Sequence, residues 1–171
     1  MKKIILAFLI TGVMNAQQCP KKLQQKNKDY YAFVSTGFDV RNLAIGSKPT
    51  NDKSALDVQF KIGARANVLE ISMFYESFNR INFQSYGVNV NGVMQLYKNF
   101  DLALGVEFGS VIREGNSNFL MVGTNSEIRL DLGKFIVSLQ LNNRYRGDLI
   151  KYGNNLPIVN SGFFNIYYKL N

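Results

Sequence analysis

Residues 56–66, which read LDVQFKIGARA, carry an apolar side chain at every second position. Charged residues stand at three of the positions between them: Asp57, Lys61 and Arg65. A period of two is that of a β-strand with one apolar and one polar face. In a soluble barrel the apolar face would line the core, whereas in a membrane barrel it would face lipid and the charges would fill the interior. The stretch therefore predicts a strand and leaves open which face points inward.

The same alternation recurs through most of the chain. Strands are expected near residues 30–40, 55–66, 68–78, 83–96, 100–112, 119–132, 135–145 and 159–170. Each is long enough for a tilted strand of roughly 9–11 residues to cross a bilayer. The 13 Phe and 9 Tyr residues are also of types enriched in strands. These features predict an all-β domain of eight strands, of which the first has apolar residues at both parities and no clear inward face.

The connections between the expected strands differ in length. Short ones are expected at residues 66–68, 97–99 and 132–134, where Asn and Gly suit tight hairpins. The other connections are residues 41–54, 79–82, 113–118 and 146–158, and two of these are long. Short turns and longer loops therefore fall mainly at opposite ends of an antiparallel, up-and-down arrangement.

The N-terminus has the layout of a secretory signal peptide. A basic start is followed by an eleven-residue apolar run from Ile4 to Met14 and then by the small residue Ala16. The run is too short to cross a bilayer as a helix. We therefore expect residues 1–16 to be a signal peptide, residues 17–28 a basic linker, and residues 29–171 one β-barrel domain.

Charge and cysteine content limit the partners of the exported chain. Removing residues 1–16 takes away two of the 20 basic residues and none of the 12 acidic ones, which leaves 18 − 12, or +6. Because the lysines of the linker account for much of this excess and the protein is exported, we expect no nucleic-acid partner. Cys19 is the only cysteine, so no intrachain disulfide can form. We take it as a free thiol, with lipidation as the alternative.

The polar parity of the strands carries a nearly balanced set of charges. If it is enclosed, these charges must pair, because an unpaired buried charge is very costly. The predicted interior polar network consists of Asp57, Lys61, Arg65, Glu70, Glu76, Glu107, Arg113, Glu127, Arg129, Asp131 and Arg144. Several glycines share this parity, and small residues leave room for long side chains inside a narrow barrel.

Aromatic residues near the strand ends favour a membrane barrel over a soluble one. Such residues form girdles at the two membrane interfaces. The set expected to do so here is Tyr30, Tyr31, Phe78, Phe83, Tyr97, Phe100, Phe119, Phe135, Tyr145, Tyr167 and Tyr168. The export signal and the lack of disulfides fit a Gram-negative envelope.

The chain resembles the small eight-stranded outer-membrane β-barrel proteins over about residues 29–171. The resemblance rests on the strand count, the alternation of short turns with longer loops, and the stretches LDVQFKIGARA, FDLALGVEFGSVI and FNIYYKLN. It implies an eight-stranded antiparallel up-and-down transmembrane β-barrel in outer-membrane lipid, with periplasmic termini, external loops and insertion by the barrel assembly machinery. That machinery commonly reads a terminal aromatic residue, whereas this chain ends Leu170-Asn171 after Tyr167 and Tyr168.

The residue types present leave little room for catalysis. The chain has no His, which removes Ser-His and Asp-His catalysis and the commonest metal ligand. Glu107 and Glu127 could act as acid and base, but mixed charges at interior barrel positions are more often a structural network. We therefore expect a non-enzymatic protein and assign no catalytic residue, cofactor or metal site.

The remaining role is structural or surface binding through the loops at residues 41–54 and 146–158, where an extracellular ligand would dock. The alternatives are a soluble exported β-barrel that binds an apolar ligand and a narrow outer-membrane channel. Eight strands leave an interior that side chains fill, which argues against a wide pore. The last loop contains Arg146-Gly147-Asp148, a tripeptide that cell-adhesion receptors bind, and we interpret it as a coincidence.

Overall fold

The computed structural model describes residues 30–40, 56–79, 82–113, 116–151 and 157–170. Its strands are β1 (Tyr30–Asp39), β2 (Asp57–Ala66), β3 (Leu69–Phe78), β4 (Phe83–Tyr97), β5 (Phe100–Arg113), β6 (Asn116–Asp131), β7 (Phe135–Arg146) and β8 (Ile158–Leu170). A short helix, α3 (Asp148–Lys151), lies between β7 and β8. The expected signal peptide, the linker, Cys19 and the loop at residues 41–54 lie outside the described residues.

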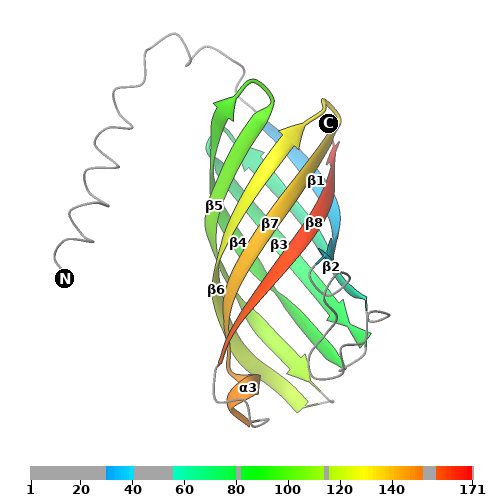
Figure 1. Ribbon diagram of the computed structural model, residues 1–171, viewed down its shortest axis with the longest axis vertical. Helices are drawn as coiled ribbons and strands as arrows, with labels where there is room; N and C mark the ends of the chain where they lie inside the picture. Colours follow the sequence, from blue (N-terminus) through cyan, green and yellow to red (C-terminus); the bar gives the residue numbers. More distant parts are fainter. Residues whose placement is uncertain (1–29, 41–55, 80–81, 114–115, 152–156, 171) are drawn as a thin grey trace, which may run out of the picture.

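The eight strands form one closed barrel in which each strand pairs with its neighbours in sequence (Figure 1). Closure comes from β1 and β8, which pair antiparallel from Ala32 opposite Leu170 to Asp39 opposite Phe163. The predicted all-β, eight-stranded antiparallel fold is confirmed. The β5–β6 hairpin is longer than predicted, because Arg113 still pairs with Asn116 beyond a register shift between Val111 and Arg113.

Three tight turns lie at one end of the barrel, together with the end of β8, and α3 lies at the other (Figure 1). Each turn holds a residue with positive φ: Asn67 at 56°, Lys98 at 41° and Gly133 at 90°. Asn and Gly adopt this region readily, whereas Lys does so less often. The carbonyl of Lys98 accepts a hydrogen bond from the side-chain amide of Gln95, which holds this turn.

The apolar parity of the strands faces outward and the polar parity faces inward. Ile62, Met73 and Leu141 are 57%, 64% and 67% exposed. Arg129 and Glu70, in contrast, are each 1% exposed. This arrangement is the reverse of a soluble barrel with an apolar core, so the stretch LDVQFKIGARA directs its charges into the interior.

The face of β1 that the sequence left open is decided by the barrel. Phe33, Ser35 and Asp39 are buried, while Val34 and Thr36 are exposed. An aromatic residue, a hydroxyl and a carboxylate therefore share the inner face. Because the inward Phe33 is apolar like the outward Val34, the alternation of apolar and polar residues did not reveal which face of β1 points inward.

Glycines on the inner wall allow close approach of neighbouring strands. Gly87 on β4 lies opposite Gly109 on β5. A Cβ on Gly109 would lie 3.1 Å from the Cα of Gly87 and would collide with the carbonyl oxygen of Tyr86. The two residues therefore leave no room for side chains where they face each other.

Candidate functional site

The residues of the predicted interior network all lie on the inner face of the barrel. Nine of the eleven are buried: Asp57, Lys61, Arg65, Glu70, Glu76, Glu107, Glu127, Arg129 and Arg144. Arg113 and Asp131 are half-buried near the two ends. The side chains come from five of the eight strands, so the network crosses the lumen instead of following one wall.

Arg129 on β6 is the centre of one layer. It donates to both carboxylate oxygens of Glu70 on β3, at 2.5 and 2.7 Å, and to Glu127 Oε2 at 2.7 Å. The guanidinium also lies over the ring of Tyr167, with Cζ 5.0 Å from the centroid. Two carboxylates and an aromatic face thus surround one cation, which is the arrangement that a buried charge requires.

Lys61 on β2 lies in the same layer. Its ammonium donates to the side-chain carbonyl of Gln140 and to the hydroxyl of Tyr167, the latter at 3.3 Å. Tyr167 in turn donates to Glu127 Oε1 at 2.6 Å, and Asn165 donates to Gln140 at 3.1 Å. Residues from β2, β6, β7 and β8 are joined by this chain of hydrogen bonds, so the layer ties separate strands together.

Arg144 on β7 is the centre of a second layer. It donates to Glu76 on β3 and to Glu107 on β5, and all three side chains are buried. Phe74 and Phe163 lie beside it, with ring centroids 5.7 and 5.8 Å from the guanidinium carbon. This second layer closes the lumen where β3, β5, β7 and β8 face one another.

Ion pairs also lie at both ends of the barrel. At the turn end Arg65 donates to Asp101 at 2.7 Å and Lys169 to Asp131 at 2.6 Å. At the α3 end Arg146 donates to both carboxylate oxygens of Asp148, at 3.0 and 2.7 Å.

The α3 end is packed with apolar side chains beneath these charges. The guanidinium of Arg146 lies 3.9 Å from the ring centroid of Phe83. Phe83 belongs to a buried cluster with Phe74, Phe78, Val111 and Met121. Asp148 and Leu149, the first residues of α3, are 0% and 6% exposed. The short helix is thus anchored in the mouth of the barrel, where the sequence predicted only a loop.

The Arg146-Gly147-Asp148 tripeptide is part of this mouth. Arg146 is 9% exposed and Asp148 fully buried, and they bind each other. A receptor that reads this tripeptide needs both charged groups free. The geometry therefore supports the interpretation that the tripeptide is a coincidence of sequence.

Several aromatic residues expected in the interfacial girdles point inward instead, and for them the prediction was wrong. Phe78, Phe83 and Tyr167 are buried, while Tyr31 and Phe119 are half-buried on the same inner face. Their position near strand ends gave no sign of the face, because only parity within the strand decides it. The sequence argument also missed Asp148 and Asp39, whose burial depends on a short helix and on the ambiguous first strand.

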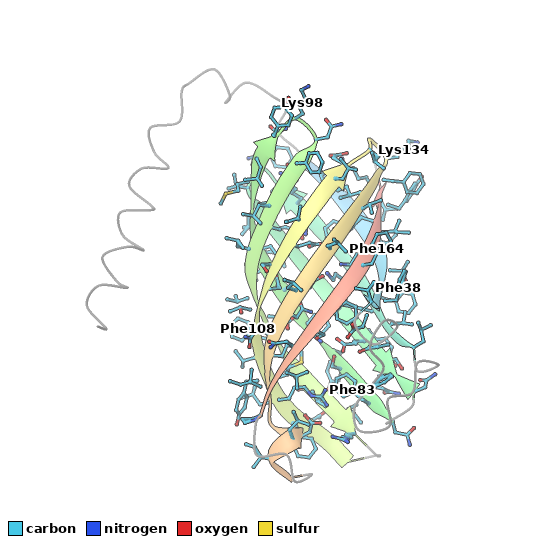
Figure 2. The ribbon with its side chains drawn as sticks, viewed as in Figure 1. Phe38, Phe83, Lys98, Phe108, Lys134 and Phe164 are labelled. Atoms are coloured by element: carbon cyan, nitrogen blue, oxygen red, sulfur yellow. The ribbon has the colours of Figure 1, made fainter. Side chains whose placement is uncertain are left out.

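The outer wall carries the remaining aromatics. At the turn end Tyr30, Tyr97, Phe100, Phe135 and Tyr168 are between 39% and 62% exposed. Farther from this end, Phe38 and Phe164 pack ring against ring, with centroids 5.4 Å apart (Figure 2). Figure 2 also places Lys98 and Lys134 at the turn end. The outer surface is thus an apolar belt that is bordered at the turn end by aromatic and cationic side chains.

The interior carboxylates that could act as acid and base are held in ion pairs. The carboxylates weighed as acid and base, Glu107 and Glu127, both bind arginines. Within the residues described, no group of three or more His, Cys, Asp or Glu is placed to hold a metal ion. The same part of the chain contains no helix that is long and apolar enough to cross a bilayer.

Comparison with known proteins identifies the fold. No protein-family model matches the chain, and no curated protein matches it. The crystal structure of neisserial surface protein A (NspA) is similar, with a TM-score of 0.51 and 12% identity over 82% of this chain and 97% of that chain. A chain from the de novo design of transmembrane β-barrels is similar at a TM-score of 0.48 and 14% identity, over 85% and 98% of the two chains. The likeness to NspA shows a shared eight-stranded barrel fold.

Proposed function

We propose that this chain is a non-enzymatic outer-membrane β-barrel protein of a Gram-negative bacterium, with a structural or surface-binding role. The observation that carries the proposal is the apolar outer belt around a charged interior. A wall of exposed Leu, Ile, Val, Phe and Met side chains is costly in water and favourable in lipid. The fold shared with NspA, named as a surface protein, supports the same placement.

The ion pairs that cross the lumen favour a structural role over conduction. Arg129 and Arg144 hold carboxylates from facing strands together, and the aromatic cluster around Phe83 fills the α3 end. An ion crossing the barrel would have to break these pairs. In single-channel recordings of the purified barrel we expect no steady conductance, and a constant open level would support the narrow-channel alternative.

A binding role rests on the loops, which we place outside the cell. The N-terminal end of β1 and the end of β8 lie with the tight turns, so periplasmic termini put the α3 end outward. Barrel insertion by the assembly machinery and contact with outer-membrane lipid belong to the same proposal. Shortening residues 41–54, or the part of residues 146–158 that follows α3, should then abolish ligand binding while leaving the barrel folded.

Lysine labelling on intact cells tests both location and orientation. Lys48 and Lys53 fall in the first long loop, whereas Lys98 and Lys134 lie at the turn end. A membrane-impermeant amine reagent should modify the first pair on intact cells, and the second pair only after the outer membrane is opened. The reverse pattern would contradict the orientation. Recovery of the protein as a soluble periplasmic monomer, without a heat-dependent shift on a denaturing gel, would overturn the location.

A further inference from the structure

A hollow of about 540 Å³ lies where β5, β6, β7 and β8 run side by side. Its outward-facing lining consists of Leu104, Thr124, Ser126, Leu141, Asn143 and Asn160. The strand register brings these side chains together, since Asn143 pairs with Thr124 and with Asn160, and Ser126 pairs with Leu104 and Leu141. Two amides and two hydroxyls therefore lie together on the outer wall of the barrel.

The polar side chains lie inside the apolar belt and not above it. On the α3 side they are bordered by the half-buried Val122 and by Tyr145 and Ile158, which are 40% and 57% exposed. On the turn side they are bordered by Ile128 and Leu139, which are 56% and 60% exposed. The hollow is thus enclosed by side chains that face lipid.

The two amides of the hollow lie nearer to the α3 ends of their strands, whereas Leu104, four residues after the start of β5 at Phe100, lies nearer to the turns. Asn143 comes three residues before the end of β7 at Arg146, and Asn160 two residues after the start of β8 at Ile158. If the α3 end faces outward, this depth is where headgroups and acyl chains of the outer leaflet meet. This step rests on the membrane placement proposed above.

The lining has a definite chemical character. It offers amide and hydroxyl donors together with amide oxygen acceptors, and none of its side chains is charged. Uncharged polar groups turned toward hydrocarbon are costly unless they find hydrogen-bond partners. A phosphate group would seek cations, which this lining lacks, whereas an amide or hydroxyl both donates and accepts.

We propose that the hollow binds a membrane lipid whose acyl chains carry amide or hydroxyl groups close to the headgroup. An acyl chain lies against Leu104 and Leu141, and its polar group bonds to Thr124 and Asn143. The concave shape favours a narrow lipid chain over a second copy of the barrel, because two convex cylinders meet along a ridge. The volume lies in the range of about 300–1,000 Å³ that small-molecule sites occupy.

Tryptophan quenching tests the proposal, because the chain has no Trp of its own. Tyr145→Trp places one reporter on the same face as Asn143, and Met73→Trp places a control reporter on β3. Each variant is inserted into phosphatidylcholine vesicles containing either brominated phosphatidylcholine or a brominated N-(3-hydroxyacyl) amphiphile of equal chain length. We expect the amphiphile to bind beside Tyr145→Trp roughly 3- to 10-fold more strongly than phosphatidylcholine, as one or two hydrogen bonds would give. Met73→Trp should be quenched equally by both.

Substitutions in the hollow separate recognition from general lipid contact. In the Tyr145→Trp background, Thr124→Val keeps the shape and removes the hydroxyl, and Asn143→Leu removes the amide. Both substitutions should bring the ratio of amphiphile binding to phosphatidylcholine binding close to one. Thr36→Val, which removes the hydroxyl of an exposed threonine on β1, should leave this ratio unchanged. A heat-dependent gel shift verifies that each variant is folded.

The other outcomes overturn the inference in distinguishable ways. Equal quenching of Tyr145→Trp by both lipids would show ordinary lipid contact and no site. Quenching of Met73→Trp with none at Tyr145→Trp would show that protein, such as a second copy, covers the hollow. Quenching at neither reporter would overturn the membrane placement itself, and this inference with it.

Discussion

The inner and outer surfaces of the same strands follow opposite rules. On the inner surface Arg144 binds Glu76 and Glu107, each from a different strand, and both contacts require those residues at those positions. On the outer surface Leu139 is 60% exposed and needs only to be apolar. The same alternating pattern therefore specifies two different surfaces. The inner one depends on particular residue pairs, and the outer one depends only on apolar character. Substitutions should therefore have different consequences on the two faces.

The largest effect is expected from breaking an interior ion pair. Arg144→Met leaves the carboxylates of Glu76 and Glu107 buried without their cation, which should lower the free energy of unfolding by about 3–5 kcal/mol. Urea unfolding of the barrel in lipid vesicles measures this change. The matched control is the triple variant R144M/E76Q/E107Q, which removes both charges and should recover most of the loss. A triple variant no more stable than the single one would contradict the pairing.

A charge placed on the outer wall should lower the free energy of unfolding by somewhat less, and the loss should depend on the depth of the charge in the bilayer. Leu139→Arg, well inside β7, should destabilise the barrel by about 2–4 kcal/mol because it places a cation in hydrocarbon. Phe135→Arg, at the turn end of the same strand, should cost only about 0–1 kcal/mol because it reaches the interface. The same unfolding measurement distinguishes them. Equal costs at the two depths would argue that this face does not meet a bilayer.

A methyl group added to the inner wall should also lower the stability of the barrel more than one added to the outer wall. A Cβ on Gly87 would meet backbone atoms of Phe108 and lie 2.7 Å from the Cα of Gly109. Gly87→Ala should therefore destabilise the barrel by roughly 1–3 kcal/mol. Gly92 faces outward and would bring its Cβ no closer than 3.8 Å to the Leu104 carbonyl oxygen. Gly92→Ala should change stability by less than about 0.5 kcal/mol, and a reversed order would contradict the close approach of β4 and β5.

The smallest effect is expected from exchanging one apolar residue for another on the outer wall. Leu139→Ile preserves the apolar character of the side chain, and in the proposed membrane placement its neighbour is lipid, so stability should stay within about 0.5 kcal/mol. Thermal or urea unfolding checks this. A loss comparable with that of Arg144→Met would mean that the outer wall also depends on specific packing.

The sequence predicted most of the fold because both faces leave a period-two signal. In LDVQFKIGARA the apolar residues and the three charges separate cleanly, and Lys61 and Arg65 do face the interior. The first strand lacked that signal, since the inward Phe33 has the same apolar character as the outward Val34. Tyr167 was misjudged for a related reason: a large aromatic suits a girdle as well as an interior.

The pairing inside the barrel could not be predicted from the sequence. Which carboxylates meet Arg129 or Arg144 depends on how far each strand is shifted along its neighbour, and alternation carries no information about that shift. The anchoring of Asp148 by Arg146 depends on α3, a four-residue helix that has too few residues to leave a periodic signal. The polar hollow on the outer wall could not be predicted either, because only the strand register shows that Thr124 and Ser126 lie beside Asn143 and Leu141.

The apolar parity of the strands faces outward, where we propose that it meets lipid, and the charged parity fills the interior. Spin-label scanning of β5 from Phe100 to Phe108, with Cys19 replaced and one cysteine introduced at a time, tests it most directly. In reconstituted vesicles, even positions such as Leu104 and Val106 should be accessible to lipid-dissolved oxygen, and odd positions such as Ala103 and Glu107 to neither oxygen nor a water-soluble relaxer. Accessibility of the odd positions to lipid, or of either parity to water along the whole strand, would contradict the account.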